Sequence, residues 1–146
     1  MATGTLPGWL KPMNKFVRVL AWLNLPLGSI HVLTVPGRTS GKPRTTPISP
    51  MTFAGRRYLV AALSDGDWAR NVRAAGRGVL ARGHRKRSVE LPEVTDPAQR
   101  RAVVAAFPTE VPTGIPFFQR LGMVKDGTPE EFAAIADDVA VFEIRT

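Results

Sequence analysis

The 146-residue chain contains no cysteine and only two histidines. The absence of cysteine excludes a disulfide framework, thiolate-ligated zinc or iron–sulfur centres, and thiolate catalysis. His31 and His84 lie far apart in the sequence with no carboxylate at ligand spacing, so we expect no metal site. No apolar run approaches the roughly 18 residues of a membrane span, and the N-terminus lacks the layout of an export signal. These absences predict a cytoplasmic protein.

Acidic residues are scarce in the first part of the chain. Residues 1–87 carry 15 Lys and Arg against two Asp, a net charge of +13, whereas residues 88–146 carry five against ten, a net charge of −5. This asymmetry predicts that the first part binds an anionic partner, such as a nucleic acid, a membrane surface or a phosphorylated small molecule.

Residues 10–25 have the apolar spacing of a helix, with Lys11, Lys15 and Arg18 forming a basic stripe. Two interpretations stay open. The helix packs on the domain with its charges in water, or it lies at the inner face of a membrane with Trp9 and Trp22 at the boundary. The second interpretation makes the protein a peripheral membrane protein.

The rest of the chain reads as short strands and helices separated by Gly and Pro. We predict strands at 30–35, 44–53, 57–63, 78–82, 87–94 and 139–145, and helices at 67–75, 96–107 and 128–136. Asp65 or Asp67 is expected to cap the first of these helices, and residues 108–127 to form a partly ordered loop. This is a mainly β fold with short helices (α+β), an antiparallel barrel or half-barrel. We expect one domain over 1–146, with an N-terminal amphipathic helix at 1–28 and the barrel at 29–146.

The most distinctive segment is the turn at residues 37–43 (GRTSGKP). It is not a nucleotide P-loop, because three residues separate its glycines and proline follows its lysine. Its glycines allow a tight backbone, while Arg38, Lys42 and Arg44 supply three cations. Backbone N–H groups and arginines in such a turn favour an anion; the alternative is a solvated basic hairpin loop.

Residues 34–47 (TVPGRTSGKPRTTP), followed by GRRYLVAA at 55–62 and by Trp68 and Asn71, resemble the deazaflavin-dependent nitroreductase family. The resemblance covers about residues 30–92 and the final strand. It implies a six-stranded split β-barrel, a homodimer, and coenzyme F-420 as the cofactor. It also implies an oxidoreductase that transfers hydride from the reduced deazaflavin to an activated double bond, a quinone or a nitro compound.

The resemblance also implies roles for individual residues. Arg38, Thr39, Ser40, Gly41 and Arg44 would bind the coenzyme's phosphate and glutamyl tail. Pro47 would lie beside the ring system, and Ala62, Leu63 and Ser64 would offer backbone groups to it. Trp68 and Asn71, one helical turn apart, would pack and hydrogen-bond near the cofactor.

The electron acceptor is expected to be a lipophilic small molecule such as menaquinone. Ser49, Phe117 and Phe118 are the candidate substrate contacts. An apolar lid formed by the two phenylalanines favours flat, apolar acceptors. The two phenylalanines have core packing as their alternative interpretation. Ser49 is the one candidate proton donor, and Tyr58 is expected to be structural.

Two other function classes stay open. Because the carboxylates of Asp65 and Asp67 would repel a phosphate, the chain is alternatively a non-catalytic split-barrel protein that binds FMN, a tetrapyrrole or a lipid-like ligand. A small nucleic-acid-binding barrel is the third hypothesis, based on residues 82–87 (RGHRKR). No aromatic residues are interleaved there for base stacking, so we expect no nucleic acid partner.

Overall fold

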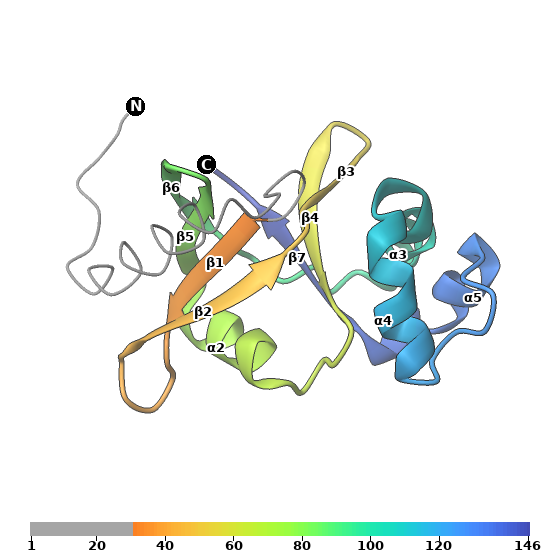
Figure 1. Ribbon diagram of the computed structural model, residues 1–146, viewed down its shortest axis with the longest axis horizontal. Coiled ribbons are helices and arrows are strands. Elements are labelled where there is room, and N and C mark those ends of the chain that lie inside the picture. Colours follow the sequence, from red (N-terminus) through yellow and green to blue (C-terminus); the bar gives the residue numbers. More distant parts are fainter. Residues whose placement is uncertain (1–30) are drawn as a thin grey trace.

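The computed structural model describes residues 31–146, which form a mixed α+β fold with antiparallel sheets and short helices (Figure 1). The N-terminal amphipathic helix predicted within residues 1–28 lies outside the described residues. Most of the predicted strands and helices are present, and their differences from the prediction concern where they end and which sheet they join.

The first sheet has the strand order β2-β1-β5-β6, with every pair antiparallel. β1 is central because its residues 32–35 are buried. β2 lies at an edge, where Pro43 and Pro47 cannot donate a ladder hydrogen bond and need not do so. The strands are β1 (His31–Pro36), β2 (Pro43–Ile48), β5 (Arg77–Arg82) and β6 (Arg85–Glu90).

The second sheet has the order β3-β4-β7 and consists of β3 (Met51–Phe53), β4 (Arg56–Ala61) and β7 (Ala140–Ile144). The single strand predicted at 44–53 is therefore wrong: it is divided at Ser49-Pro50, and β2 and β3 belong to different sheets. The reason is that Pro50 lacks the N–H that an uninterrupted ladder needs. Outside the named strands, isolated bridges such as Glu90 with Arg145 connect the segments.

The described residues thus contain seven strands in two open sheets, rather than the six strands of a closed barrel. The short β3 is the additional strand. The antiparallel pairing and the mixture with short helices agree with the prediction.

The helices are α2 (Asp67–Ala75), α3 (Pro97–Glu110), α4 (Ile115–Arg120) and α5 (Pro129–Ala134), with the 3-10 turns η2 (Pro112–Gly114) and η3 (Ala136–Asp138). The bounds of α2 are as predicted, but its N-cap is Gly66, which has no side chain to bond the first turn. α3 continues beyond its predicted end, and α4 lies within the predicted loop. In Figure 1, α3, α4 and α5 gather beyond β3 and β4, while α2 lies by β1 and β2.

Two hydrophobic clusters hold these elements together. One lies between the two sheets and α2, and includes Leu33, Leu59, Val72 and Phe142. The other packs the second sheet against α3, α4 and α5. The site described next lies where elements of both clusters meet.

Candidate active site

The turn between β1 and β2 is closed by its own backbone. The N–H of Gly37 donates to the carbonyl of Lys42 at 2.7 Å, and the N–H of Gly41 donates to the carbonyl of Gly37 at 2.9 Å. Gly41 has φ +74°, which favours glycine. Within the described residues, the N–H groups of Thr39 and Ser40 have no partner. The turn therefore presents two free donors at its tip.

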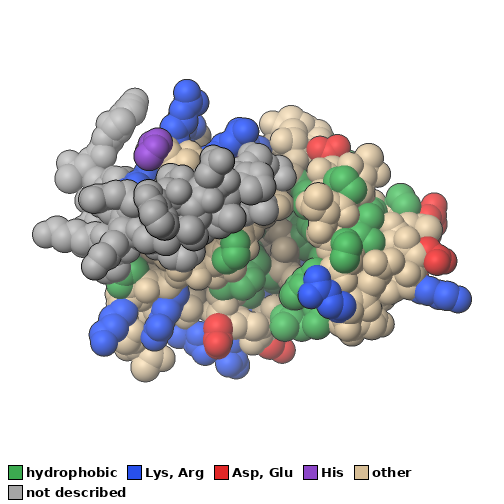
Figure 2. Space-filling view, viewed as in Figure 1, with side chains coloured by type: hydrophobic (Ala, Val, Ile, Leu, Met, Phe, Trp, Pro, Cys, Tyr) green, Lys and Arg blue, Asp and Glu red, His purple; other side chains and the backbone are tan. Residues whose placement is uncertain are grey.

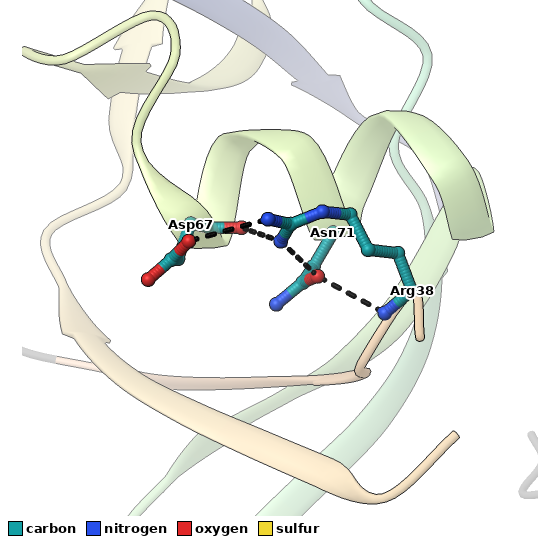
Figure 3. Close-up of polar contacts among 3 residues, drawn as sticks. All are labelled: Arg38, Asp67 and Asn71. Atoms are coloured by element: carbon teal, nitrogen blue, oxygen red, sulfur yellow. Dashed lines mark hydrogen bonds and ion pairs between the residues drawn. The ribbon is translucent and has the colours of Figure 1, made fainter. Parts of the chain in front are cut away.

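Arg38 is oriented by α2 (Figure 3). The Oδ1 atom of Asn71 accepts both the backbone N–H of Arg38 at 3.1 Å and its Nη1 at 2.9 Å. Asn71 is buried, with 5% of its surface exposed. A buried amide that accepts twice from one residue fixes the direction of that residue's guanidinium. Asn71, which also lines the pocket beside it, thus orients an arginine through its side-chain oxygen.

Arg38 also meets a carboxylate. Its Nη2 lies 3.4 Å from Oδ1 of Asp67, whose side chain is 91% exposed. An ion pair this exposed contributes little to stability and is readily screened. The sequence prediction gave Asp67 a possible role as a helix cap; the structure shows it beside Arg38 instead.

A cationic pocket of about 620 Å³ lies between the turn, β2 and the start of α2. Arg44 enters it from β2 and forms no ion pair with any described residue. Figure 2 shows Lys and Arg side chains gathered over the β1–β2 turn at the lower left. The pocket is lined by Gly37, Arg38, Thr39, Ser40, Arg44, Thr45, Thr46, Asp67, Trp68 and Asn71.

A second cavity, of about 480 Å³, is apolar and lies between β2, β4 and the segment from α3 to α4. Within residues 31–146, the polar side chains that line it are the hydroxyls of Thr46, Ser49 and Thr113 and the indole of Trp68, and no charged residue does so. It is lined by Thr46, Pro47, Ile48, Ser49, Leu59, Val60, Ala62, Trp68, Phe107, Val111, Thr113, Gly114, Phe117 and Phe118. Such a cavity suits a flat apolar molecule with a few polar atoms.

The two candidate phenylalanines of α4 differ in their environment. Phe118 is 2% exposed and packs edge-on against Phe107 and Phe132, with ring centroids 5.2 and 4.9 Å apart. Phe117 is 49% exposed and lies at the cavity's margin. Phe118 is therefore both a core residue and part of the wall, whereas Phe117 is free to contact a ligand.

The loop from β4 to α2 is fixed by Arg73. Its Nη1 donates to the carbonyl of Ser64 at 2.6 Å, and its Nε and Nη2 each donate to Glu93 at 2.9 Å. The hydrogen bond and the charge of Glu93 raise the pKa of Arg73. The carbonyl of Leu63 accepts from Gly66, so the carbonyls of Leu63 and Ser64 are both occupied. Their N–H groups have no partner within residues 31–146.

The two hollows meet at Thr46 and Trp68, which line both. The Trp68 ring is held by the core, with its centroid 6.0 Å from that of Phe142. The result is one elongated site with an apolar end and a cationic end. Thr46 was missed by the sequence analysis, although it lies two residues from Arg44 and so shares its face of β2.

The predicted site residues do not all lie in these hollows. Gly41, Leu63 and Ser64 line neither hollow, and Leu63 is 54% exposed. Tyr58 is buried in the core and its hydroxyl accepts from Gln99 Nε2 at 3.2 Å, a structural role. In the described part of the chain, no group of side chains is arranged to hold a metal ion, and no helix is long and apolar enough to cross a membrane.

Comparison with known proteins gives a family and a fold. The family described as F-420H(2)-dependent quinone reductase matches residues 18–113. A search of curated proteins found no match. Among solved structures, an F-420-H2 dependent reductase, FDR-A, is 18% identical with a TM-score of 0.55, over 81% of this chain and 95% of that one.

Two further solved structures share the fold. A domain-swapped dimer is 19% identical with a TM-score of 0.55, over 91% of this chain and 99% of that one. A nimC/nimA family protein from Clostridium acetobutylicum is 14% identical with a TM-score of 0.53, over 87% of this chain and 77% of that one.

Proposed function

The chain belongs to the F-420H(2)-dependent quinone reductase family, whose coenzyme is F-420, and we propose that its elongated site binds this coenzyme and a flat, apolar acceptor. The observation that carries the proposal is the junction of an apolar cavity with a cationic pocket at Thr46 and Trp68. A ligand with a flat ring and an anionic tail matches both ends of this site.

The cationic pocket is the proposed site of the coenzyme's phosphate and glutamyl tail. Arg44 has no competing ion pair among the described residues, and Arg38 is already oriented by Asn71. Thr39 and Ser40 add hydroxyls and free N–H groups. Charge-assisted hydrogen bonds from such a set are stronger than neutral ones. Gly41 acts through the turn geometry, since it does not line the pocket.

The apolar cavity is the proposed site of the ring and the acceptor. When bound, reduced F-420 supplies the hydride. Pro47, Ala62 and Trp68 form part of its wall, and Leu63 and Ser64, which follow Ala62 in the chain, have N–H groups with no partner among the described residues. Phe117 covers the acceptor and, with the buried Phe118, keeps water away. Because hydride transfer needs close orientation, a rigid, dry wall is what the protein must provide.

Ser49 is the proposed hydroxyl group that contacts the acceptor's oxygen and passes it a proton. Its side chain lines the apolar cavity, where the other hydroxyls are those of Thr46 and Thr113. No ionisable side chain of the described residues lines this cavity, which favours a hydroxyl or water as the source of the proton. We propose a quinone as the acceptor, with enones and nitro compounds as further acceptors of the same shape.

Binding is tested by titrating the protein with oxidised F-420 and following tryptophan fluorescence, with FMN as the comparison. We expect F-420 to quench the fluorescence and FMN to do so weakly. Arg44→Ala should weaken binding by about 1.5–3 kcal/mol, which is roughly ten- to a hundredfold. Arg101→Ala, an exposed arginine on α3, is the matched control and should bind as the wild type does. Equal affinity of the Arg44 variant would remove this residue from the site.

Hydride transfer is tested separately by mixing reduced F-420 with a short-chain quinone and following the return of the oxidised coenzyme's visible band. We expect the band to return with quinones, and more slowly with the Phe117→Ala variant because the acceptor is less well covered. If F-420 binds but no acceptor restores the band, the chain is a binding protein and the proposal fails.

We also propose a homodimer, a single domain, the split β-barrel arrangement, and a cytoplasmic location. The dimer is supported by the structural relative described as a domain-swapped dimer. The single domain is supported by the chain length of 146 residues. Light scattering of the purified protein tests the dimer, and a single cooperative unfolding transition tests the single domain.

A further inference from the structure

A basic hollow of about 1040 Å³ lies at the turn of the β5–β6 hairpin. Among the described residues, its lining includes five Lys or Arg side chains and two histidines, with no carboxylate. The lining residues are His31, Pro50, Thr52, Arg57, Leu80, Arg82, His84, Arg85, Lys86, Arg87 and Val89. Neither the fold nor the coenzyme site accounts for this concentration of positive charge.

The register of the hairpin places like charges against each other. Arg82 lies directly opposite Arg85 across the strands, and Arg87 lies two residues further along the same face of β6. Like charges opposite each other destabilise a strand pair. None of these three arginines forms an ion pair with a described residue. The arrangement is therefore one that an external anion would stabilise.

This hollow is separate from the coenzyme site. His31, which begins β1, lines the basic hollow, whereas Gly37, which follows the end of β1, lines the cationic pocket. Six residues of extended strand span about 20 Å. A coenzyme tail bound near Gly37 therefore leaves Arg82, Arg85 and Arg87 without a counter-charge among the described residues.

The sequence before β1 supplies no counter-charge either. Residues 1–30 contain no Asp or Glu, and their Lys11, Lys15 and Arg18 add to the positive charge. The anion must come from outside this segment. Single-stranded nucleic acid is disfavoured, because the lining that residues 31–146 provide holds no Phe, Tyr or Trp on which a base could stack.

We propose that the β5–β6 hairpin binds the headgroups of anionic phospholipids and holds the enzyme at a membrane surface. Quinones with long apolar tails reside in membranes, so this inference rests on the proposed function. Ser49 lines the apolar cavity and its neighbour Pro50 lines the basic hollow, so the two hollows share the β2–β3 corner. The basic amphipathic pattern of residues 10–25 is a second membrane signal, and stable attachment takes two.

The test measures sedimentation with phosphatidylcholine vesicles, with and without phosphatidylglycerol. The wild type should bind only the anionic vesicles, and added salt should weaken binding by screening the charges. Arg85→Gln with Arg87→Gln should weaken binding about thirtyfold, since each basic residue near the surface contributes roughly fivefold. Arg101→Gln with Lys125→Gln removes the same charge from α3 and from the segment between α4 and α5, and should bind as the wild type does.

Two readouts separate this inference from the proposed function. The hairpin variant should reduce a short-chain quinone in solution at the wild-type rate but reduce a long-chain quinone in anionic vesicles more slowly. It should also be no less stable to heat, because it loses like-charge repulsion. If neither quinone is reduced by the wild type, the proposed function fails while sedimentation still decides the inference. Unchanged vesicle binding by the hairpin variant, or tighter binding of an oligonucleotide than of vesicles, would overturn it.

Discussion

Substitutions of Asn71 separate effects on stability from effects on coenzyme binding, because one atom of this side chain accepts two hydrogen bonds. Its Oδ1 accepts from the backbone N–H and from Nη1 of Arg38. Asn71→Ala removes both bonds and leaves the backbone N–H of Arg38 without this acceptor. Asn71→Asp keeps an oxygen in the same place and adds a negative charge to the cationic pocket. Asn71→Ala should therefore lose stability, whereas Asn71→Asp should lose coenzyme affinity.

The magnitudes follow from the contacts. A hydrogen bond to a neutral group contributes about 1 kcal/mol and one to a charged group somewhat more. Asn71→Ala should therefore cost about 2 kcal/mol of unfolding free energy, which lowers the melting temperature by roughly 4–8 °C in a chain of this size. Coenzyme binding should also weaken, because Arg38 loses its fixed direction.

Asn71→Asp should fold at least as stably as the wild type, since its carboxylate lies against the Arg38 guanidinium. A new negative charge in the pocket that holds the phosphate costs about 1–2 kcal/mol at intermediate dielectric, or five- to thirtyfold in affinity. Thermal unfolding and F-420 titration at two salt concentrations measure both effects. If Asn71→Asp binds F-420 as tightly as the wild type, the cationic pocket does not hold the anionic tail.

Three further predictions concern Asp67, Gly114 and Glu131. Asp67→Asn should tighten F-420 binding about two- to threefold at low salt, because it removes an exposed competitor for Arg38; weaker binding would show that the carboxylate assists the ligand. Gly114→Ala should lower stability by about 1–3 kcal/mol and change the acceptor profile, because its new Cβ would lie 2.7 Å from Cζ of Phe107 in the cavity wall; an unchanged melting temperature would contradict this reasoning. The pKa of Glu131 is lowered to about 2 by hydrogen bonds from the backbone N–H groups of Lys125, Thr128, Asp126 and Gly127. The contribution of Glu131 to the free energy of unfolding is therefore complete above about pH 4.5 and is lost as the pH falls towards 2. The urea midpoint of Glu131→Gln should accordingly lie below that of the wild type at pH 7, with the gap closing in acid; a gap that stays constant with pH would contradict the assignment.

The local elements were predictable because their signals are local. Asp96 accepts from Gln99 N–H at the start of α3, and Thr128 and Glu131 form a complete capping box at the start of α5. Gly76 ends α2 with φ +70°. Each of these depends on residues within one turn of each other. The prediction of a single strand at 44–53 was wrong for the opposite reason, since the sheet that each side of Ser49 joins depends on partners far away in the sequence.

The sequence by itself determined the chemistry available at the site. The glycine-bounded turn with Arg38 and Arg44, the excess of positive charge and the absence of cysteine already favoured an anionic ligand over a metal or a thiolate. These conclusions need only residue types and short spacings, which the chain carries whatever its partners in space.

Only the tertiary structure decided how those residues are used. It brought the oxygen of Asn71 to Arg38, made Asp67 a competitor rather than a cap, and placed Phe118 in the core while leaving Phe117 at the cavity margin. It also set Arg82 against Arg85 across a hairpin. Each outcome depends on strand register or helix packing between segments far apart in the chain, and those are settled by burial of the whole core rather than by any local pattern.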